Sequence, residues 1–295
     1  MLYLHKKVEI MDFYHLYPTE FQNLLNQDYE SDSYIGQGNP ASKILIIGKE
    51  CAGDAQGYEF VNNAKIWKTV SPEIIENWFD AEWDWKKYHP RQPFKGQLLI
   101  RDNKIDNIDN NNRGTSVTWM AYQNFVNLLL PENMQVHPRQ QLNFYEHCFL
   151  TELSSNCMRT SRKNPDTKKS IEHRLSPNGI LAHPFFKQFP VVILGVYRYI
   201  DWYKEVPIIQ NLSGCAMNYK GIIVSQTEYD EKSKEKLPLY RANNDFKKGE
   251  FINVHESTDG KRILLHTNHF VDNFTPRSEV YLKEIADLVR PYLKK

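Results

Sequence analysis

The sequence of 295 residues lacks the signatures of several common classes of protein. Its four cysteines form no C-x-x-C pair, which argues against a zinc ribbon and gives an iron–sulfur cluster little support. No stretch approaches the roughly 20 apolar residues that span a membrane. The N-terminal segment MLYLHKKVEIMDFYHLYPTE has no apolar core long enough for a signal peptide. We therefore expect a protein of the reducing cytoplasm that does not associate with membranes.

The common phosphate-binding and nucleophile motifs are also missing. The chain contains no G-x-x-x-x-G-K-[ST], no G-x-G-x-x-G and no G-x-S-x-G. In the segment HTNH, His266 and His269 would lie on opposite faces of a strand, so we expect no metal pair there and no cofactor. The formal net charge is +1, and any surface that attracts nucleic acid must therefore be local.

What the sequence does contain is a series of short apolar runs separated by helical patterns. The runs predict buried strands at residues 43–48, 144–153, 190–196 and 261–269. Helical spacing predicts helices at residues 114–130 and 278–293, with Ser278 as the N-cap of the second. Strands that alternate with helices are typical of a parallel sheet covered on both faces.

We therefore expect one α/β domain over residues 1–295. The predicted architecture is a three-layer αβα sandwich around a central, parallel, four-stranded sheet. Residues 225–250 are mostly polar and predict a surface insertion or a small hairpin, since a structureless loop of that length is unusual.

In such a sheet, ligands bind beyond the carboxyl ends of the strands, where the strand order reverses. The residues that follow the four apolar runs include two carboxylates, a histidine, amides and hydroxyls. They are Gly48, Lys49, Glu50, Gly53, Glu152, Ser154, Ser155, Asn156, Gly195, Tyr197, Thr267, Asn268 and His269. These groups together predict a site for hydrolysis.

Four segments at these strand ends, IIGKECAG, LTELSSN, VVILGV and HTNHF, resemble the motifs of the uracil-DNA glycosylase superfamily in their order and spacing. The resemblance covers about residues 42–290, and it implies that family's fold and base-excision chemistry for DNA repair. Four positions depart from the family pattern: Lys49 is an extra residue in the first turn, Ala52 and Phe270 replace prolines, and Glu152 replaces an asparagine. The chain therefore resembles a divergent member.

The resemblance implies two catalytic residues. Cleavage of an N-glycosidic bond develops a cationic sugar and an anionic base, so a carboxylate near the sugar and a donor near the base both help. Glu50 is the candidate carboxylate and His269 the candidate donor. Each has a structural alternative: Glu50 could accept hydrogen bonds from turn amides, and His269 could simply pack at a strand end. A pocket filled by Phe270 would argue against catalysis.

The candidates for binding the base or substrate are Gly48, Glu152, Asn156, Tyr58, Phe60 and Asn268. The resemblance gives Tyr58 and Phe60 the position of an aromatic residue that stacks on an extruded base, although core packing is as good an explanation. An ionised Glu152 accepts hydrogen bonds only, which favours a base edge rich in donors over uracil. Its alternative is an ion pair with Arg159 or Arg162.

A basic stretch over residues 158–174 follows the second motif. Its Arg159, Arg162, Lys163 and Lys168 are candidates for contacts with phosphates of the nucleic-acid backbone, although a solvated loop is the commoner meaning of such a stretch.

The leading hypothesis is a hydrolase that cleaves the N-glycosidic bond of a nucleobase in DNA, RNA or a nucleotide. The alternative is a non-catalytic protein of the same fold that binds nucleic acid or a nucleotide. A weaker third hypothesis is a scaffold that contacts only other proteins.

Overall fold

The computed structural model describes residues 17–27, 34–49, 63–68, 99–101, 104–106, 117–138, 142–155, 166–200, 206–232, 239–272 and 275–294. In this part of the chain, eight strands form one sheet in the order β1-β5-β2-β6-β10-β9-β7-β8. Their bounds are β1 (Gln37–Gly38), β2 (Ile44–Gly48), β5 (Phe149–Glu152), β6 (Val191–Leu194), β7 (Met217–Ser225), β8 (Leu239–Asn243), β9 (Phe251–Ser257) and β10 (Ile263–Thr267).

The sheet is mixed, so the prediction of a wholly parallel sheet of four strands is wrong. The four predicted strands β5, β2, β6 and β10 do lie side by side and run parallel. Strand β9 runs antiparallel to β10, β7 pairs antiparallel with β9, and β1 pairs antiparallel with β5 at the other edge. Strand β7, with the sequence MNYKGIIVS, was not predicted from the sequence, because only its second half is an apolar run.

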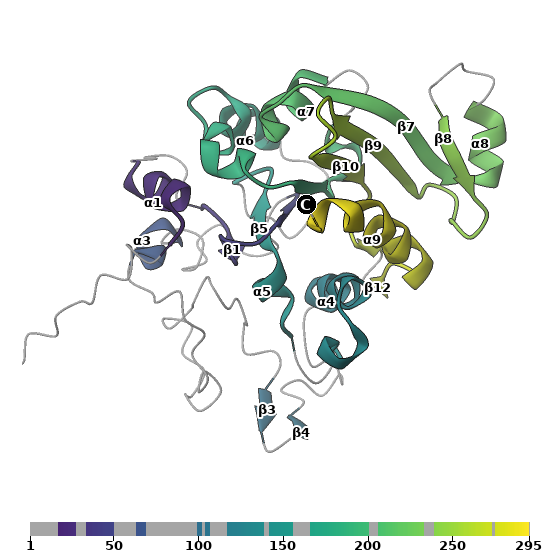
Figure 1. Ribbon diagram of the computed structural model, residues 1–295, viewed down its shortest axis with the longest axis horizontal. Helices are drawn as coiled ribbons and strands as arrows, with labels where there is room; N and C mark the ends of the chain where they lie inside the picture. The colour runs from purple at the N-terminus through teal and green to yellow at the C-terminus, as the bar shows by residue number, and fades with distance from the viewer. Residues whose placement is uncertain are drawn as a thin grey trace, which may run out of the picture.

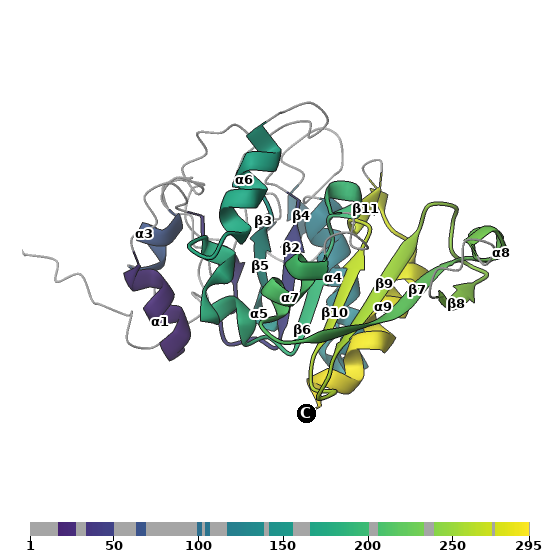
Figure 2. The same ribbon diagram turned by 90° about the horizontal axis from the view of Figure 1, so that it is seen from above.

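Strand β2 is buried on both faces, because its side chains alternate between two cores. Ile44 and Ile46 pack in one core with helices α4 (Val117–Leu129) and α9 (Glu279–Leu293). Leu45 and Ile47 pack in the other core, whose helices are α1 (Thr19–Asn26), α6 (Asp166–Leu175) and α7 (Val206–Ser213). Helices thus cover both faces of the sheet, in the three layers expected from the sequence (Figures 1 and 2).

The remaining elements are short. They are α3 (Asn63–Trp67), α5 (Phe144–His147), α8 (Gln226–Lys232), β3 (Leu99–Arg101), β4 (Lys104–Asp106), β11 (Val271–Asp272), β12 (Thr275–Pro276) and the 3-10 turns η4 (Glu132–Met134), η6 (Ile180–Ala182), η7 (Pro184–Lys187) and η8 (Tyr197–Tyr199). Strand β3 pairs with β4, and β11 pairs with β12, as two small ribbons apart from the main sheet. No helix of the described ranges has the length and hydropathy needed to cross a membrane.

Residues 144–147 form helix α5, where the sequence predicted the start of a strand. The buried side chain of Gln123 explains the difference, because its Oε1 accepts hydrogen bonds from the backbone N–H groups of Asn143 and Phe144 at 2.7 and 3.0 Å. These N–H groups lie at the helix start, where no intrahelical acceptor is available. Gln123, about 20 residues earlier in the chain, therefore stabilises the start of α5, which the local sequence pattern does not predict.

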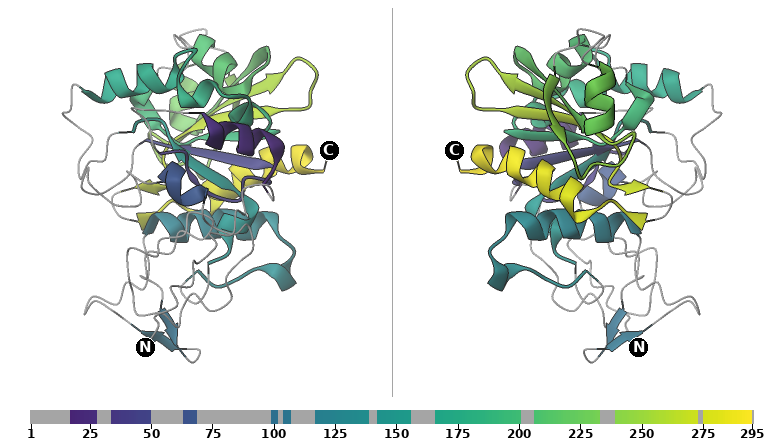
Figure 3. Two further views of the ribbon diagram at one scale, coloured as in Figure 1. Left: turned by 90° about the vertical axis from the view of Figure 1, so that its left-hand side faces the viewer. Right: turned by 90° about the vertical axis from the view of Figure 1, so that its right-hand side faces the viewer.

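Two further predictions concern the C-terminal half. The polar segment at 225–250 contains α8 and β8, and β8 adds to the edge of the main sheet by pairing parallel with β7 (Figure 3). The predicted N-cap of α9 is confirmed, since Ser278 Oγ accepts a hydrogen bond from the backbone N–H of Tyr281 at 3.3 Å.

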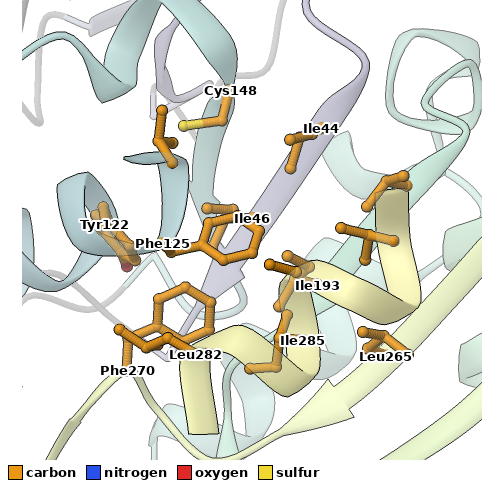
Figure 4. Close-up of a cluster of buried hydrophobic side chains, with 14 of the residues drawn as sticks. Ile44, Ile46, Tyr122, Phe125, Cys148, Ile193, Leu265, Phe270, Leu282 and Ile285 are labelled. Atoms are coloured by element: carbon orange, nitrogen blue, oxygen red, sulfur yellow. The ribbon is translucent and has the colours of Figure 1, made fainter. Parts of the chain in front are cut away.

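Phe270 lies in the core between the sheet and α4. Its ring centre is 5.6 Å from that of Tyr122 and 5.3 Å from that of Phe125, both in edge-to-face arrangements (Figure 4). The side chain is 1% exposed, so it is a core residue that anchors the chain just after β10. It packs in the same core cluster as Ile46 and Ile193.

We expect Phe270→Ala to lower the free energy of unfolding by about 3–5 kcal/mol, the usual cost of deleting a buried phenyl ring. Val280→Ala is the control, since Val280 is 40% exposed on α9, and it should change the free energy by less than about 0.5 kcal/mol. Urea denaturation of both variants measures the difference. Equal effects would show that Phe270 does not contribute to this core.

Candidate functional site

The carboxyl ends of β2 and β6 mark the point at which the strand order of the parallel strands reverses. Strand β5, the next parallel strand after β2 in the sequence, lies on one side of β2, and the later strands β6 and β10 lie on the other. Gly48 ends β2, and Gly195 follows β6, with its N–H donating to the carbonyl of Ile47 at 2.9 Å. In open α/β sheets this position is the usual ligand site, and we name it the switch-point edge.

At this edge the carboxylate of Glu152 lies directly over Gly48. The two residues are paired in register between β2 and β5, and a Cβ added to Gly48 would be 2.2 Å from Glu152 Oε2. Any side chain at position 48 would therefore displace the carboxylate. Beyond the strands, the N–H groups of Leu153 and Ser154 donate to the carbonyls of Gly48 and Lys49 at 2.8 and 3.0 Å, which extends the pairing into the loop.

His269, which follows β10, is held from two sides. Its ring Nδ1 accepts a hydrogen bond from the backbone N–H of Val271 at 3.2 Å, and its carbonyl accepts one from Arg277 Nε at 2.7 Å. Burial, together with the nearby charge of Lys49, lowers the pKa of His269 to about 4. The ring is therefore neutral at pH 7, and because Nδ1 accepts a hydrogen bond, its proton is on Nε2. A neutral imidazole of this kind can donate to an oxygen that gains negative charge.

Arg277 is itself fixed by a buried ion pair. Its guanidinium Nη1 lies 3.1 Å from Glu250 Oε1, and the other carboxylate oxygen of Glu250 accepts the N–H of Lys247 at 2.8 Å. The side chain of Glu250 is 2% exposed and that of Arg277 is 10% exposed, and the pair joins the loop before β9 to the segment between β12 and α9. Sequence reasoning did not select either residue, since nothing local connects positions 250 and 277.

The side chain of Asn268 is hydrogen-bonded to the backbone at the start of β9. Its side-chain oxygen accepts the N–H of Phe251 at 2.8 Å, and its Nδ2 donates to the carbonyl of Gly249 at 3.0 Å. These bonds tie the start of β9 to the end of β10. The predicted contact of Asn268 with a base stays a prediction.

Tyr197 is a further residue of this edge whose role the sequence did not indicate. It has a positive φ of 52°, which is unusual for a residue other than glycine. Its carbonyl is 2.7 Å from His266 Nε2, and the other ring nitrogen of His266 is 3.3 Å from Asn253 Nδ2. This buried chain of hydrogen bonds holds the loop after β6 in its conformation.

Several predicted site residues lie outside the described residues. They are Glu50, Tyr58, Phe60, Asn156, Arg159, Arg162 and Lys163. Lys168 is described: it is exposed on α6, where its ammonium lies 3.7 Å from Glu172. Its predicted contact with a phosphate is untested. Among the described residues, no three His, Cys, Asp or Glu side chains gather as metal ligands would.

Comparison of the chain with known protein families, with curated proteins and with solved structures returned no match. The resemblance to the uracil-DNA glycosylase superfamily therefore depends on the four motifs alone.

The contact between Gly48 and Glu152 predicts an energetic coupling. We expect Gly48→Ala to destabilise the fold by about 1–3 kcal/mol, because the new methyl group collides with the carboxylate. In a Glu152→Ala background this collision no longer occurs. The change in unfolding free energy of the double variant should therefore differ from the sum of the two single changes by about 1 kcal/mol or more. Denaturation of the two single variants and the double variant measures this.

The matched control for that cycle is Gly195→Ala, at the end of the neighbouring strand. There the nearest atom to an added Cβ is 3.7 Å away, an ordinary contact, so the substitution should be tolerated. Additive effects of Gly48→Ala and Glu152→Ala would contradict the observed approach of the carboxylate.

The protonation of His269 predicts a dependence on pH. Its pKa is about 4 in the folded chain and 6.5 in an exposed imidazole, so between these values the unfolded chain binds a proton that the folded chain excludes. Stability should therefore fall as the pH is lowered from 6.5 towards 4, and His269→Gln should reduce this dependence. NMR titration of the ring gives the pKa directly, and a midpoint near 6.5 would contradict the neutral donor.

Proposed function

We propose that this chain is a hydrolase, similar to uracil-DNA glycosylases, that cleaves the N-glycosidic bond of a nucleobase in DNA, RNA or a nucleotide. The observation that carries the proposal is His269, a neutral histidine held at the switch-point edge with its proton on Nε2. The proposed substrate is DNA in the first place, encountered in the cytoplasm.

His269 suits the departing base. When the N-glycosidic bond breaks, its electron pair leaves with the base, water adds to the sugar carbon, and a proton from that water ends on the base. A donor fixed beside the base oxygen stabilises the negative charge before the proton arrives. A histidine with a pKa of about 4 keeps one donor and one acceptor at neutral pH, so it can donate without adding a charge of its own.

Glu50 would supply the second group. It directly follows Lys49 after β2, on the strand that ends at the switch point. A carboxylate there would stabilise the cationic sugar and orient the attacking water. This role is part of the proposal, as are the stacking roles of Tyr58 and Phe60 and the contribution of Asn156 to the base pocket.

Glu152 would determine which base is accepted. Its carboxylate lies over Gly48, at the end of the strand that leads to Glu50. An ionised carboxylate accepts hydrogen bonds but does not donate them, so it complements an amino group or a ring N–H. The preferred base would therefore be richer in donors than uracil.

The nucleic-acid backbone would lie along the basic stretch that contains Arg159, Arg162, Lys163 and Lys168. Solvent weakens the exposed pair between Lys168 and Glu172, so Lys168 could exchange the carboxylate for a phosphate at little cost.

A non-catalytic protein that binds nucleic acid or a nucleotide is the alternative. It is favoured by Asn268, whose side-chain amide is engaged with Phe251 and Gly249 and so holds the loop. A site that has lost one base-reading amide could still bind a nucleotide without cleaving it.

The test is base release from single- and double-stranded oligonucleotides that carry uracil, hypoxanthine, xanthine or the normal bases. Wild type is compared with Glu50→Gln and His269→Ala, and with Lys261→Ala, an exposed residue between β9 and β10 at the opposite end of the sheet, as the control. We expect the first two substitutions to lower the rate by roughly a hundredfold or more and the control to retain it.

The choice of base gives a second readout. Glu152→Gln, which restores a donor, should shift the preference towards bases with more acceptors. Binding of oligonucleotides without release of any base would support the non-catalytic alternative, and the absence of both would contradict the proposal.

A further inference from the structure

Lys49 joins the ends of the two strands between which the strand order reverses. It follows Gly48 at the end of β2, and its Nζ lies 5.4 Å from the ring centre of Tyr199 and 5.7 Å from that of Tyr197. Both tyrosines belong to η8, the turn that follows β6. The ammonium group is therefore placed over two aromatic rings, an arrangement in which the ring faces attract a cation.

The aromatic side of this arrangement is held in place. Tyr197 keeps its positive φ because its carbonyl is bonded to His266, and its ring lies 6.1 Å from that of Phe251 at the start of β9. A backbone conformation of this kind persists only where surrounding contacts impose it, and it is often found at functional sites. The tyrosine ring below Lys49 is thus positioned by β9 and β10 together.

Lys49 also acts on His269 across the edge. After burial, its positive charge is the next cause of the lowered pKa of that ring. The backbone of Gly195, at the end of β6, lies between the ends of β2 and β10: its N–H donates to the carbonyl of Ile47 at 2.9 Å, and a Cβ added to it would be 3.9 Å from the Cα of His269. Lys49 and His269 follow β2 and β10, the two parallel neighbours of β6, so both belong to one edge of the sheet. A cation and a neutral N–H donor at this edge would together complement an oxygen that carries negative charge.

We propose that Lys49 is a further substrate-binding residue of this edge, whose ammonium, held over Tyr197 and Tyr199, binds an anionic oxygen beside His269. This inference rests on the proposed function, and it adds Lys49 as the residue that binds a negatively charged oxygen of the substrate. Two oxygens share this chemistry: a phosphate oxygen of the substrate, and the oxygen of the base as it leaves. Lysine suits either, as a compact charge with three donors, and the partly buried position strengthens its field.

The variants that test the inference are Lys49→Met, which removes the charge at similar length, and Lys49→Arg, which keeps it. Lys261→Met is the matched control, an exposed lysine in the turn between β9 and β10 at the opposite end of the sheet. Binding of inorganic phosphate, a nucleoside and its 5′-monophosphate is measured by NMR titration. The ring of His269 is followed in the same spectra.

We expect Lys49→Met to weaken binding of the anion by roughly ten- to a hundredfold, the range for a lost charge-assisted hydrogen bond, whereas Lys49→Arg retains most of it. The pKa of His269 should rise in Lys49→Met and stay near 4 in the control. A larger loss for the monophosphate than for the nucleoside identifies a phosphate oxygen. Unchanged binding of all three probes, with a lower kcat for base release and an unchanged KM, identifies the oxygen of the leaving base, which carries negative charge only in the transition state.

The outcomes separate this inference from the proposed function. If Lys49→Met binds and cleaves as wild type does while His269→Ala abolishes release, the inference about Lys49 is overturned and the proposed function stands. If phosphate binding depends on Lys49 but no base is released from any substrate, the anion site stands and the proposed hydrolase does not. If wild type binds none of the three probes and releases no base, both are overturned.

Discussion

The pairing of β2 with β5 on one side and β6 on the other is the constraint on which the rest of the structure depends. Both pairings are parallel, so all three strands end at the same edge of the sheet. Because β2 is buried on both faces, it cannot shift by one residue without exchanging the side chains of its two cores. The register in turn sets Gly48 opposite Glu152 and carries Lys49 to the end of β6. The place of the candidate site is therefore a consequence of core packing.

Apolar packing alone does not fix the positions of the side chains at this edge; polar contacts between the loops also hold them. Arg277 and Glu250 hold the carbonyl of His269, Asn268 ties β10 to β9, and His266 holds the loop that contains Tyr197. Each of these contacts joins segments that are distant in the sequence. Buried polar groups are stabilising only when they are satisfied, so such a network favours one arrangement of the loops over others. The edge is thus pre-organised, which is what binding and catalysis both require.

The sequence predicts the parts of this structure that depend on local pattern. Strands β2, β6 and β10 are continuous apolar runs, and α9 has both helical spacing and a capping serine, so all four were identified within a few residues. Helix α5 was missed because its start is stabilised by Gln123 from another helix. Lys49 and Tyr197 were both placed at strand ends from the sequence, but their contact was not predicted, because it joins two loops separated by about 150 positions. Glu152 could be selected from its place at the end of an apolar run, but its approach to Gly48 follows only from the register of β2 and β5.

The electrostatics of the edge connect the fold to its proposed chemistry. Burial makes a positive charge on His269 unfavourable. The same low dielectric strengthens the electrostatic effect of the charge on Lys49. An edge with one fixed cation and one neutral donor attracts negative charge without having to release a proton first. Burial is the main reason that the pKa of His269 is low, and the charge of Lys49 lowers it further, so the ring stays neutral and keeps its donor. In the proposed chemistry Lys49 therefore carries the charge of the edge and His269 donates the hydrogen bond.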